Sequence, residues 1–230
     1  MEIETTTARA VRWPSVPYVL PFAVFAAFLV LQHYAPLPGH VDLVARTVVL
    51  AGVLGIASRS ALSFRLSQPA SSILLGIAVF ALWIAPDALF PHYRQSWLFN
   101  NGFVGTLGKS IAPNLRGDPL SLVLRSFRAI ILVPIIEELF WRAWLMRWLI
   151  NPRFETVPLG AWASGAFWIT AVLFASEHGP YWDVGLLAGV LYNWWMIRTK
   201  SLGDCILAHA VTNACLSAYV IVGGHWEYWQ

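Results

Sequence analysis

Charged residues are scarce in this sequence, since only 12% of its 230 residues are Asp, Glu, Lys or Arg, whereas 58% are hydrophobic. Soluble domains carry about a quarter charged residues and roughly half apolar ones. A soluble globule could bury its core with far fewer apolar residues, so the excess indicates a surface that faces lipid. The net charge of +3 comes from scattered Lys and Arg without a dense basic run, and we therefore expect no nucleic-acid partner.

Cysteine is also scarce, because the chain holds only Cys205 and Cys215. Both fall in one predicted helix, about 15 Å apart along its axis, so they cannot bridge each other and are expected to be small core residues. The apolar stretch near the N-terminus is too long for a signal-peptide core, and we expect it to be retained as the first span.

Long apolar runs dominate what is present, and each is long enough for a membrane helix of roughly 20 residues or close to it. The sequence predicts an all-α, polytopic integral membrane protein with about seven transmembrane helices. The expected spans are residues 17–34, 43–57, 70–90, 129–150, 159–178, 184–198 and 202–222. The connection at 91–120 is rich in Gly, Pro and Asn, which indicates a loop with room for a short interfacial helix or an eighth, partial span.

Aromatic and basic residues mark the ends of these spans. Tryptophan prefers the membrane interface, and we expect this anchoring role for the residues near span ends. They are Trp13, Trp83, Trp97, Trp148, Trp182, Trp194 and Trp195. With seven spans, one side collects more Lys and Arg, including Arg9 and Arg12, and the positive-inside rule then places the N-terminus in the cytoplasm. Lys109 falls on the other side.

An acidic pair, Glu137 and Glu138, lies inside the fourth apolar run. A charged group at the centre of a span costs about 2.5–3.5 kcal/mol, so function is the default hypothesis for this pair. Arg142 follows Glu138 at i+4 and can pair with it, which makes Glu137 the freer carboxylate and a candidate general base. The alternative is a purely structural ion-pair cluster that locks helix packing.

Depth in the membrane supports the same reading of Glu137. If Arg125 and Arg128 extend to the interface, the helix enters the bilayer near residue 129 and Glu137 lies about 12 Å deep.

Histidine and asparagine add polar groups to two further spans. His178 closes the fifth span, four residues after Phe174, while Glu177 beside it is expected to be solvated. His209 and Asn213 are at i and i+4 of the seventh span, on one helix face. Taken alone, this pair could be an interhelical hydrogen-bond pair, and His178 an interfacial residue. Four other histidines lie at span ends or in loops and receive no role: His33, His40, His92 and His225.

Three ordered blocks carry a resemblance to a known family. The blocks are Glu-Glu-x-x-x-Arg at residues 137–142, Phe-x-x-x-His at 174–178 and His-x-x-x-Asn at 209–213. The sequence resembles the CPBP intramembrane proteases, which include type II CAAX prenyl endopeptidases and bacteriocin-processing or immunity proteins. The resemblance covers residues 130–220, and its flanking sequence is also similar to a bacterial subgroup found with exosortase-type protein sorting systems. We therefore expect a protease core at 121–230 and spans of uncertain role at 1–120.

The resemblance implies roles for the side chains at these positions. Glu137 and His178 would activate the water that attacks a peptide carbonyl, while His209 and Asn213 would stabilise the tetrahedral oxyanion. Glu138 and Arg142 would orient Glu137. The substrate would be a prenylated tail, a sorted membrane protein or a peptide precursor.

Metal dependence is left open by the family, whose members have been described both as metalloproteases and as glutamate-dependent enzymes. Glu137, His178 and His209 could form a zinc site. A His-Glu-x-x-His motif is absent and no Cys or Asp completes a conventional ligand set nearby, so we favour a mechanism without metal or other cofactor.

Two other classes of function remain in view. One is a non-enzymatic bacteriocin-immunity or scaffold membrane protein that keeps the polar cluster for packing. The other is a small transporter or proton pathway that uses the same buried groups. For the protease, the expected location is the bacterial inner membrane, with the lipid bilayer and a protein or peptide substrate as partners.

Overall fold

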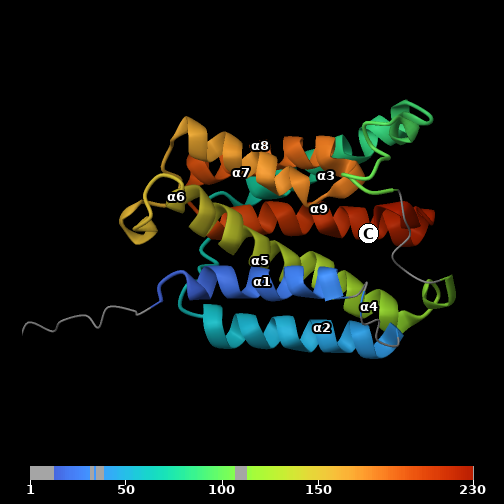
Figure 1. Ribbon diagram of the computed structural model, residues 1–230, viewed down its shortest axis with the longest axis horizontal. Coiled ribbons are helices and arrows are strands. Elements are labelled where there is room, and N and C mark those ends of the chain that lie inside the picture. Colours follow the sequence, from blue (N-terminus) through green and yellow to red (C-terminus); the bar gives the residue numbers. More distant parts are fainter. Residues whose placement is uncertain (1–12, 32–33, 35–38, 107–112, 230) are drawn as a thin grey trace, which may run out of the picture.

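Helices make up the regular structure of the computed structural model, which describes residues 13–31, 34, 39–106 and 113–229 (Figure 1). Within these residues, the only strand-like pairing is a single bridge between Asn101 and Gly105. The helices are α1 (Val16–Leu31), α2 (Gly39–Val53), α3 (Pro69–Leu89), α4 (Pro119–Phe127), α5 (Val133–Glu138), α6 (Met146–Trp148), α7 (Ser164–Ser176), α8 (Trp182–Thr199) and α9 (Leu202–Gly223). The all-α prediction is thus confirmed.

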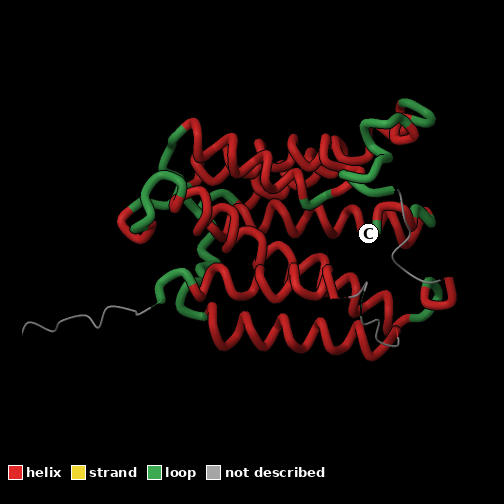
Figure 2. Tube along the Cα trace, in the orientation of Figure 1, coloured by secondary structure: helices red, strands yellow, loops and turns green. Residues whose placement is uncertain are grey.

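The helices lie side by side, with α1 and α2 along one edge of the molecule, α7 and α8 along the other, and α5 and α9 between them (Figures 1 and 2). In the described part of the chain, four helical stretches are long and apolar enough to cross a membrane, and the chain is an integral membrane protein. They are Gly39–Ser58, Pro69–Leu89, Pro119–Trp148 and Leu202–Gly223, accompanied by the shorter apolar helices Val16–Leu31 and Ser164–Ser176. Each predicted run overlaps a helix, but the count of seven or eight crossings stays a prediction.

The long helix from Pro119 to Trp148 starts well before residue 129, where we expected it to begin. Asp118 caps it, because its carboxylate accepts a hydrogen bond of 2.7 Å from the backbone N–H of Ser121. His40 at the start of α2 donates a second bond of 2.9 Å to the same carboxylate. The bonds from Ser121 and His40 lower the pKa of Asp118 to about 2. This cap therefore fixes where the helix that carries Glu137 begins.

Two π-helical segments interrupt this helix, Arg128–Leu132 and Leu139–Leu145, and short α5 lies between them. Pro134 explains the first, because proline has no N–H for the carbonyl four residues earlier and a wider turn relieves the clash of its ring. Glu137 and Glu138 form the end of α5. The acidic pair therefore lies between two π-helical segments, and such segments are frequent at functional sites.

Helices α3 and α9 pack closely because a glycine, which has no side chain, lies where they meet. A Cβ added at Gly76 would overlap the backbone carbonyl of Ala208 and would lie 2.7 Å from Cβ of Val211. The hydroxyl of Thr212 donates to the carbonyl of Gly76 at 2.9 Å. Small residues allow membrane helices to approach in this way. Gly76 therefore determines the position of the part of α9 that carries His209.

Not every residue at a predicted span end faces the interface. Trp97 is 73% exposed, whereas Trp195 is only 5% exposed, and its indole N–H donates to Ser72 at 3.1 Å. The anchoring role predicted for Trp195 is therefore wrong. Cys205 and Cys215 both lie in α9 and are free, as expected.

Several sequence-based expectations fall outside the described residues. Arg9, Arg12, His33 and Lys109 belong to this group, so the structure does not describe the basic residues nearest the N-terminus. The connection at 91–120 holds two short 3-10 helices in its described parts, Tyr93–Gln95 and Pro113–Leu115.

We predict that Gly76→Ala destabilises the protein, by about 1–3 kcal/mol, because the added methyl group forces α3 and α9 apart. Gly52→Ala is the matched control, since Gly52 is an exposed helix residue whose added Cβ would meet nothing within 4 Å. Unfolding in detergent, followed by circular dichroism, measures both variants. Equal stability of the two would contradict the close packing at Gly76.

Candidate active site

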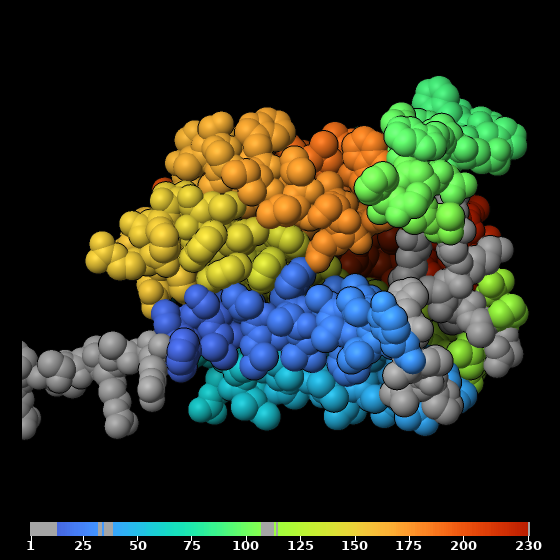
Figure 3. Space-filling view, in the orientation of Figure 1, coloured from blue at the N-terminus to red at the C-terminus, as the bar shows by residue number. Residues whose placement is uncertain are grey.

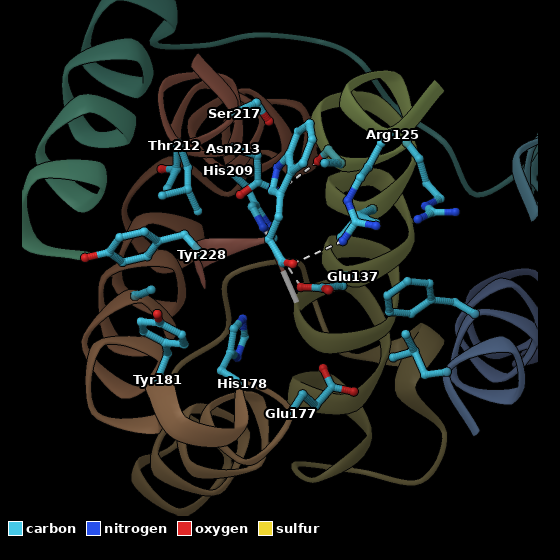
Figure 4. Close-up of a pocket in the computed structure, with 18 of the residues that line it drawn as sticks. Arg125, Glu137, Glu177, His178, Tyr181, His209, Thr212, Asn213, Ser217 and Tyr228 are labelled. Carbon is cyan, nitrogen blue, oxygen red and sulfur yellow. Dashed lines mark hydrogen bonds and ion pairs between the residues drawn. The ribbon is translucent and has the colours of Figure 1, made fainter. Parts of the chain in front are cut away.

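A cavity of about 430 Å³ brings the three sequence blocks together. Glu137, His178, His209 and Asn213 all line it, and Figure 4 shows Glu137 facing His209 and Asn213 across the space, with His178 and Glu177 below them in the view. The space-filling view shows a hollow between α1 and the end of α7, with α9 at its floor (Figure 3). Side chains from two helices and from the turn after α7 therefore meet in one cavity, and the sequence predicted that the four residues would meet.

Glu137 presents a carboxylate oxygen without a hydrogen-bond partner to this cavity. The residue is 6% exposed, and no described residue bonds its Oε2 atom. Nε2 of His209 lies 4.0 Å from this oxygen. That separation is too long for a direct hydrogen bond but leaves room for an atom bridging the two groups. Glu137 is therefore the freer carboxylate of the pair, as expected from the spacing.

Glu138 has a different task, because its carboxylate is fully buried and already bonded. Its Oε1 atom accepts from Nη1 of Arg142 at 2.9 Å and from Nδ1 of His209 at 2.9 Å. Arg142 in turn donates from Nε to Oδ1 of Asn193 at 3.0 Å. The expected pair of Glu138 and Arg142 is present, but it holds His209, whereas we had expected it to orient Glu137.

His178, in the turn after α7, is held in one orientation by the last turn of that helix. Its Nδ1 lies 2.8 Å from the backbone carbonyl of Phe174, and because a carbonyl only accepts, Nδ1 carries the hydrogen. Its ring also meets the edge of Trp83, with centroids 5.2 Å apart, and a Cβ on Gly185 would come within 3.1 Å of it. The neutral ring therefore keeps the lone pair of Nε2 for a partner other than Phe174.

Phe174, the first residue of the second block, packs against the charged and basic groups of all three blocks. Its ring lies 4.3 Å from the guanidinium carbon of Arg142 and 4.8 Å from the centroid of His178. The ring of His209 meets it at 6.2 Å. A cation over an aromatic face gains electrostatic attraction, so Phe174 helps to stabilise buried Arg142.

His209 and Asn213 lie on one face of α9, each with one side already bonded. The ring of Tyr192 stacks on His209 with centroids 5.1 Å apart. Asn213 donates one amide hydrogen from Nδ2 to the carbonyl of Ala129 at 2.8 Å. The second amide hydrogen of Asn213 is therefore available to a ligand in the cavity.

Sequence reasoning missed the contribution of α8. Asn193 bonds Arg142 and donates to the carbonyl of Phe167 at 2.8 Å, while the hydroxyl of Tyr192 donates to Thr212 at 2.7 Å. The sequence did offer an indication, because the polar residues Tyr192 and Asn193 lie inside the apolar run at 184–198.

The positions expected for two arginines, Arg125 and Arg128, differ from those in the structure. Arg125 and Arg128 were expected to extend to the interface, but both line the cavity. Glu177 lines it too and is exposed, in agreement with the solvated role expected for it.

The arrangement of His, Cys, Asp and Glu side chains decides whether the site could bind a metal ion. Among the described residues, no group of three or more His, Cys, Asp and Glu side chains has an arrangement that could hold a metal ion. Glu137 and His209 approach each other to 4.0 Å, but one side of His209 is committed to Glu138. His178 does not complete a three-ligand set with them.

Comparison with known proteins agrees with the site. The sequence model of the family described as Type II CAAX prenyl endopeptidase Rce1-like matches residues 119–215, a region that holds all three blocks. No curated protein and no solved structure matches the chain. The matched region holds the paired glutamates, and its Glu137, His178, His209 and Asn213 line the cavity. Residues 119–215 are therefore similar to the CAAX protease family of intramembrane proteases.

Proposed function

We propose that this protein is an intramembrane endopeptidase that hydrolyses a peptide bond of a membrane-associated or lipidated protein by means of a glutamate-activated water. The observation that carries the proposal is the unbonded Oε2 of Glu137, buried in a cavity that His178, His209 and Asn213 also line. A buried polar atom without a protein partner calls for an explanation, and a bound water is the simplest one. Similarity to the family supports protease activity.

The nucleophile would be a water molecule bonded to Glu137. Its oxygen attacks the peptide carbonyl while a proton passes to the carboxylate of Glu137 or to Nε2 of His178. The hydrogen on Nδ1 of His178 is bonded to Phe174, which leaves Nε2 as the acceptor. General bases of this kind contribute about 10²–10⁴ to the rate.

Two donors on α9 would stabilise the oxyanion. Asn213 offers the amide hydrogen that Ala129 does not bind. His209 donates to Glu138 from Nδ1, so it can donate to an oxyanion from Nε2 only when both ring nitrogens carry hydrogen. Carboxylates stand on both sides of the ring, Glu138 at Nδ1 and Glu137 at 4.0 Å from Nε2. Collapse of the intermediate breaks the C–N bond, and the proton taken from water passes to the leaving amine.

Glu138 and Arg142 are positioning residues in this mechanism. They fix the tautomer and the orientation of His209, and Asn193 fixes Arg142. Replacing Glu138 by Ala would leave Arg142 and His209 buried without their shared acceptor, which costs several kcal/mol in comparable sites.

The surroundings of the cavity fit a substrate that approaches through the lipid. Phe25, Phe28 and Leu29 of α1 line the cavity on the side where the space-filling view shows the hollow (Figure 3). An apolar wall of this kind suits a substrate that is itself anchored in the membrane, whether prenylated, sorted or a peptide precursor. The bacterial inner membrane, with a cytoplasmic N-terminus, is part of the proposal and is supported by the distribution of Lys and Arg.

We predict that Glu137→Gln lowers peptide cleavage at least about 10²-fold, because the amide cannot accept a proton from water. The measurement is the hydrolysis rate of a fluorogenic membrane-anchored peptide in proteoliposomes. Glu155→Gln, at an exposed glutamate outside the cavity, is the matched control and should keep full activity. Unchanged cleavage by folded Glu137→Gln would refute the mechanism, and equal loss of folded protein would favour the scaffold alternative. Movement of a solute or of protons across the membrane of the same liposomes, without peptide hydrolysis, would favour a transporter.

Asn213→Ala is expected to lower kcat by about 10²–10³ with little change in KM, because one oxyanion donor acts mainly in the transition state. Steady-state kinetics separate the two constants. A rise in KM at constant kcat would instead assign Asn213 to substrate binding.

Chelation distinguishes the mechanism proposed here from a metal-dependent one. We expect full activity after dialysis against 1,10-phenanthroline, because the described side chains offer no three-ligand set. Activity that disappears on chelation and returns with added Zn²⁺ would assign Glu137 and the histidines to a metal site.

A further inference from the structure

The chain after α9 turns back and reaches the active-site cavity. Gly224 ends the helix with a positive φ of 72°, and a 3-10 helix, Trp226–Tyr228, follows. Tyr228 and Trp229 then line the same cavity as Glu137. Trp229 is only 5% exposed. A segment that plays no part in the proposed hydrolysis thus lies within the site where hydrolysis would occur.

Side chains that line the cavity bind the backbone of this segment. Arg125 donates from Nη2 to the carbonyl of Trp229 at 3.3 Å, and its guanidinium carbon lies 5.2 Å from the Trp229 ring. The hydroxyl of Tyr181 donates to the carbonyl of Glu227 at 3.4 Å. Figure 4 shows Arg125 and Tyr181 on opposite sides of the cavity. Carbonyl groups are common to all peptides, so these donors suit a peptide of any sequence.

Further donors at this site have no partner among the described residues. Nη1 of Arg128 and Oγ of Ser217 are buried and unbonded, and both residues line the cavity. Buried donors of this kind are normally satisfied, so they point to a ligand that brings acceptor oxygens. A second peptide strand or an extended substrate has such oxygens at regular intervals.

Side chains of the segment also contact the bundle. Tyr228 donates from its hydroxyl to Asp87 at 3.0 Å, and its ring lies 5.3 Å from that of Tyr181. Trp229 packs with Val220 in a small cluster separate from the main core of the bundle. The segment is thus attached outside the main core, at the cavity that a ligand would enter.

We propose that residues 226–229 are an intramolecular occupant of the active-site cavity, which a substrate peptide displaces in order to bind Arg125, Arg128, Tyr181 and Ser217 through its backbone carbonyls. The inference rests on the proposed protease function, and it adds a preference for an aromatic or large apolar substrate side chain at the place of Trp229. The free enzyme is then partly self-inhibited, because substrate and segment compete for one site.

The test uses the full-length chain with Trp229→Ala, which weakens the hold of the segment. We expect KM for the fluorogenic peptide to fall about five-fold with kcat unchanged, since removing a competing state raises the binding-competent fraction. Trp97→Ala is the matched control, because Trp97 is 73% exposed and does not line the cavity. An unchanged or raised KM in Trp229→Ala would overturn the proposal.

Tyr228→Phe is the second variant, and it decides the matter if Trp229→Ala does not fold. It removes only the hydroxyl that bonds Asp87 and keeps the ring. We expect a smaller fall in KM, about two-fold, for the same reason. No fall in this variant, with the thermal unfolding temperature retained, would equally refute the occupant.

A binding measurement separates this inference from the function on which it rests. A fluorescent peptide with the sequence His-Trp-Glu-Tyr-Trp of residues 225–229 should bind Trp229→Ala about five-fold more tightly than the unaltered chain, by anisotropy in detergent. Replacing its last Trp by Ala should abolish that binding. Tighter binding without any cleavage would uphold the occupant and refute the protease, whereas cleavage with equal binding to both chains would do the reverse.

Discussion

The carboxylate of Glu138 holds the site together, because one buried oxygen, Oε1, accepts hydrogen bonds from two other motif residues. It binds Arg142 and His209 at 2.9 Å each, and through Arg142 it reaches Asn193. One carboxylate thus connects three helical stretches, namely Pro119–Trp148, α8 and α9. In a medium of low dielectric constant, the loss of any partner leaves a costly unpaired charge, so the network resists rearrangement. The position of His209 relative to Glu137 follows from this constraint.

Helix packing outside the network has the same effect on α9. Gly76 allows α3 to lie against α9, and Thr212 bonds both the carbonyl of Gly76 and the hydroxyl of Tyr192. The first three helices, whose role the sequence left uncertain, therefore contribute both to the placement of α9 and to the cavity wall, to which Trp83 and Phe25 belong. The division of the chain at residue 120 stays a prediction.

Much of the site could be predicted from the sequence because its motifs are local. Helical spacing alone places Glu138 beside Arg142 and His209 beside Asn213, and buried charge in an apolar run indicates function. The partner of Glu138 across the bundle could not be predicted, because it depends on the packing of helices far apart in the sequence. Two π-helical segments flank the acidic pair and change the faces that side chains occupy along the helix. The expected position of Arg125 and Arg128 was wrong because the helix that carries them begins at Pro119, well before residue 129.

The shortness of α7 has a consequence for the bilayer. At 1.5 Å per residue, the 13 residues of Ser164–Ser176 span about 20 Å, whereas the hydrocarbon layer is about 30 Å thick. A crossing of the bilayer by α7 would require the lipids beside it to thin locally, and the headgroup region would then approach the helix end. His178 lies two residues after that end. Hydrolysis by the proposed mechanism would consume one water per bond cleaved, and a locally thinned membrane would shorten the path by which each new water arrives.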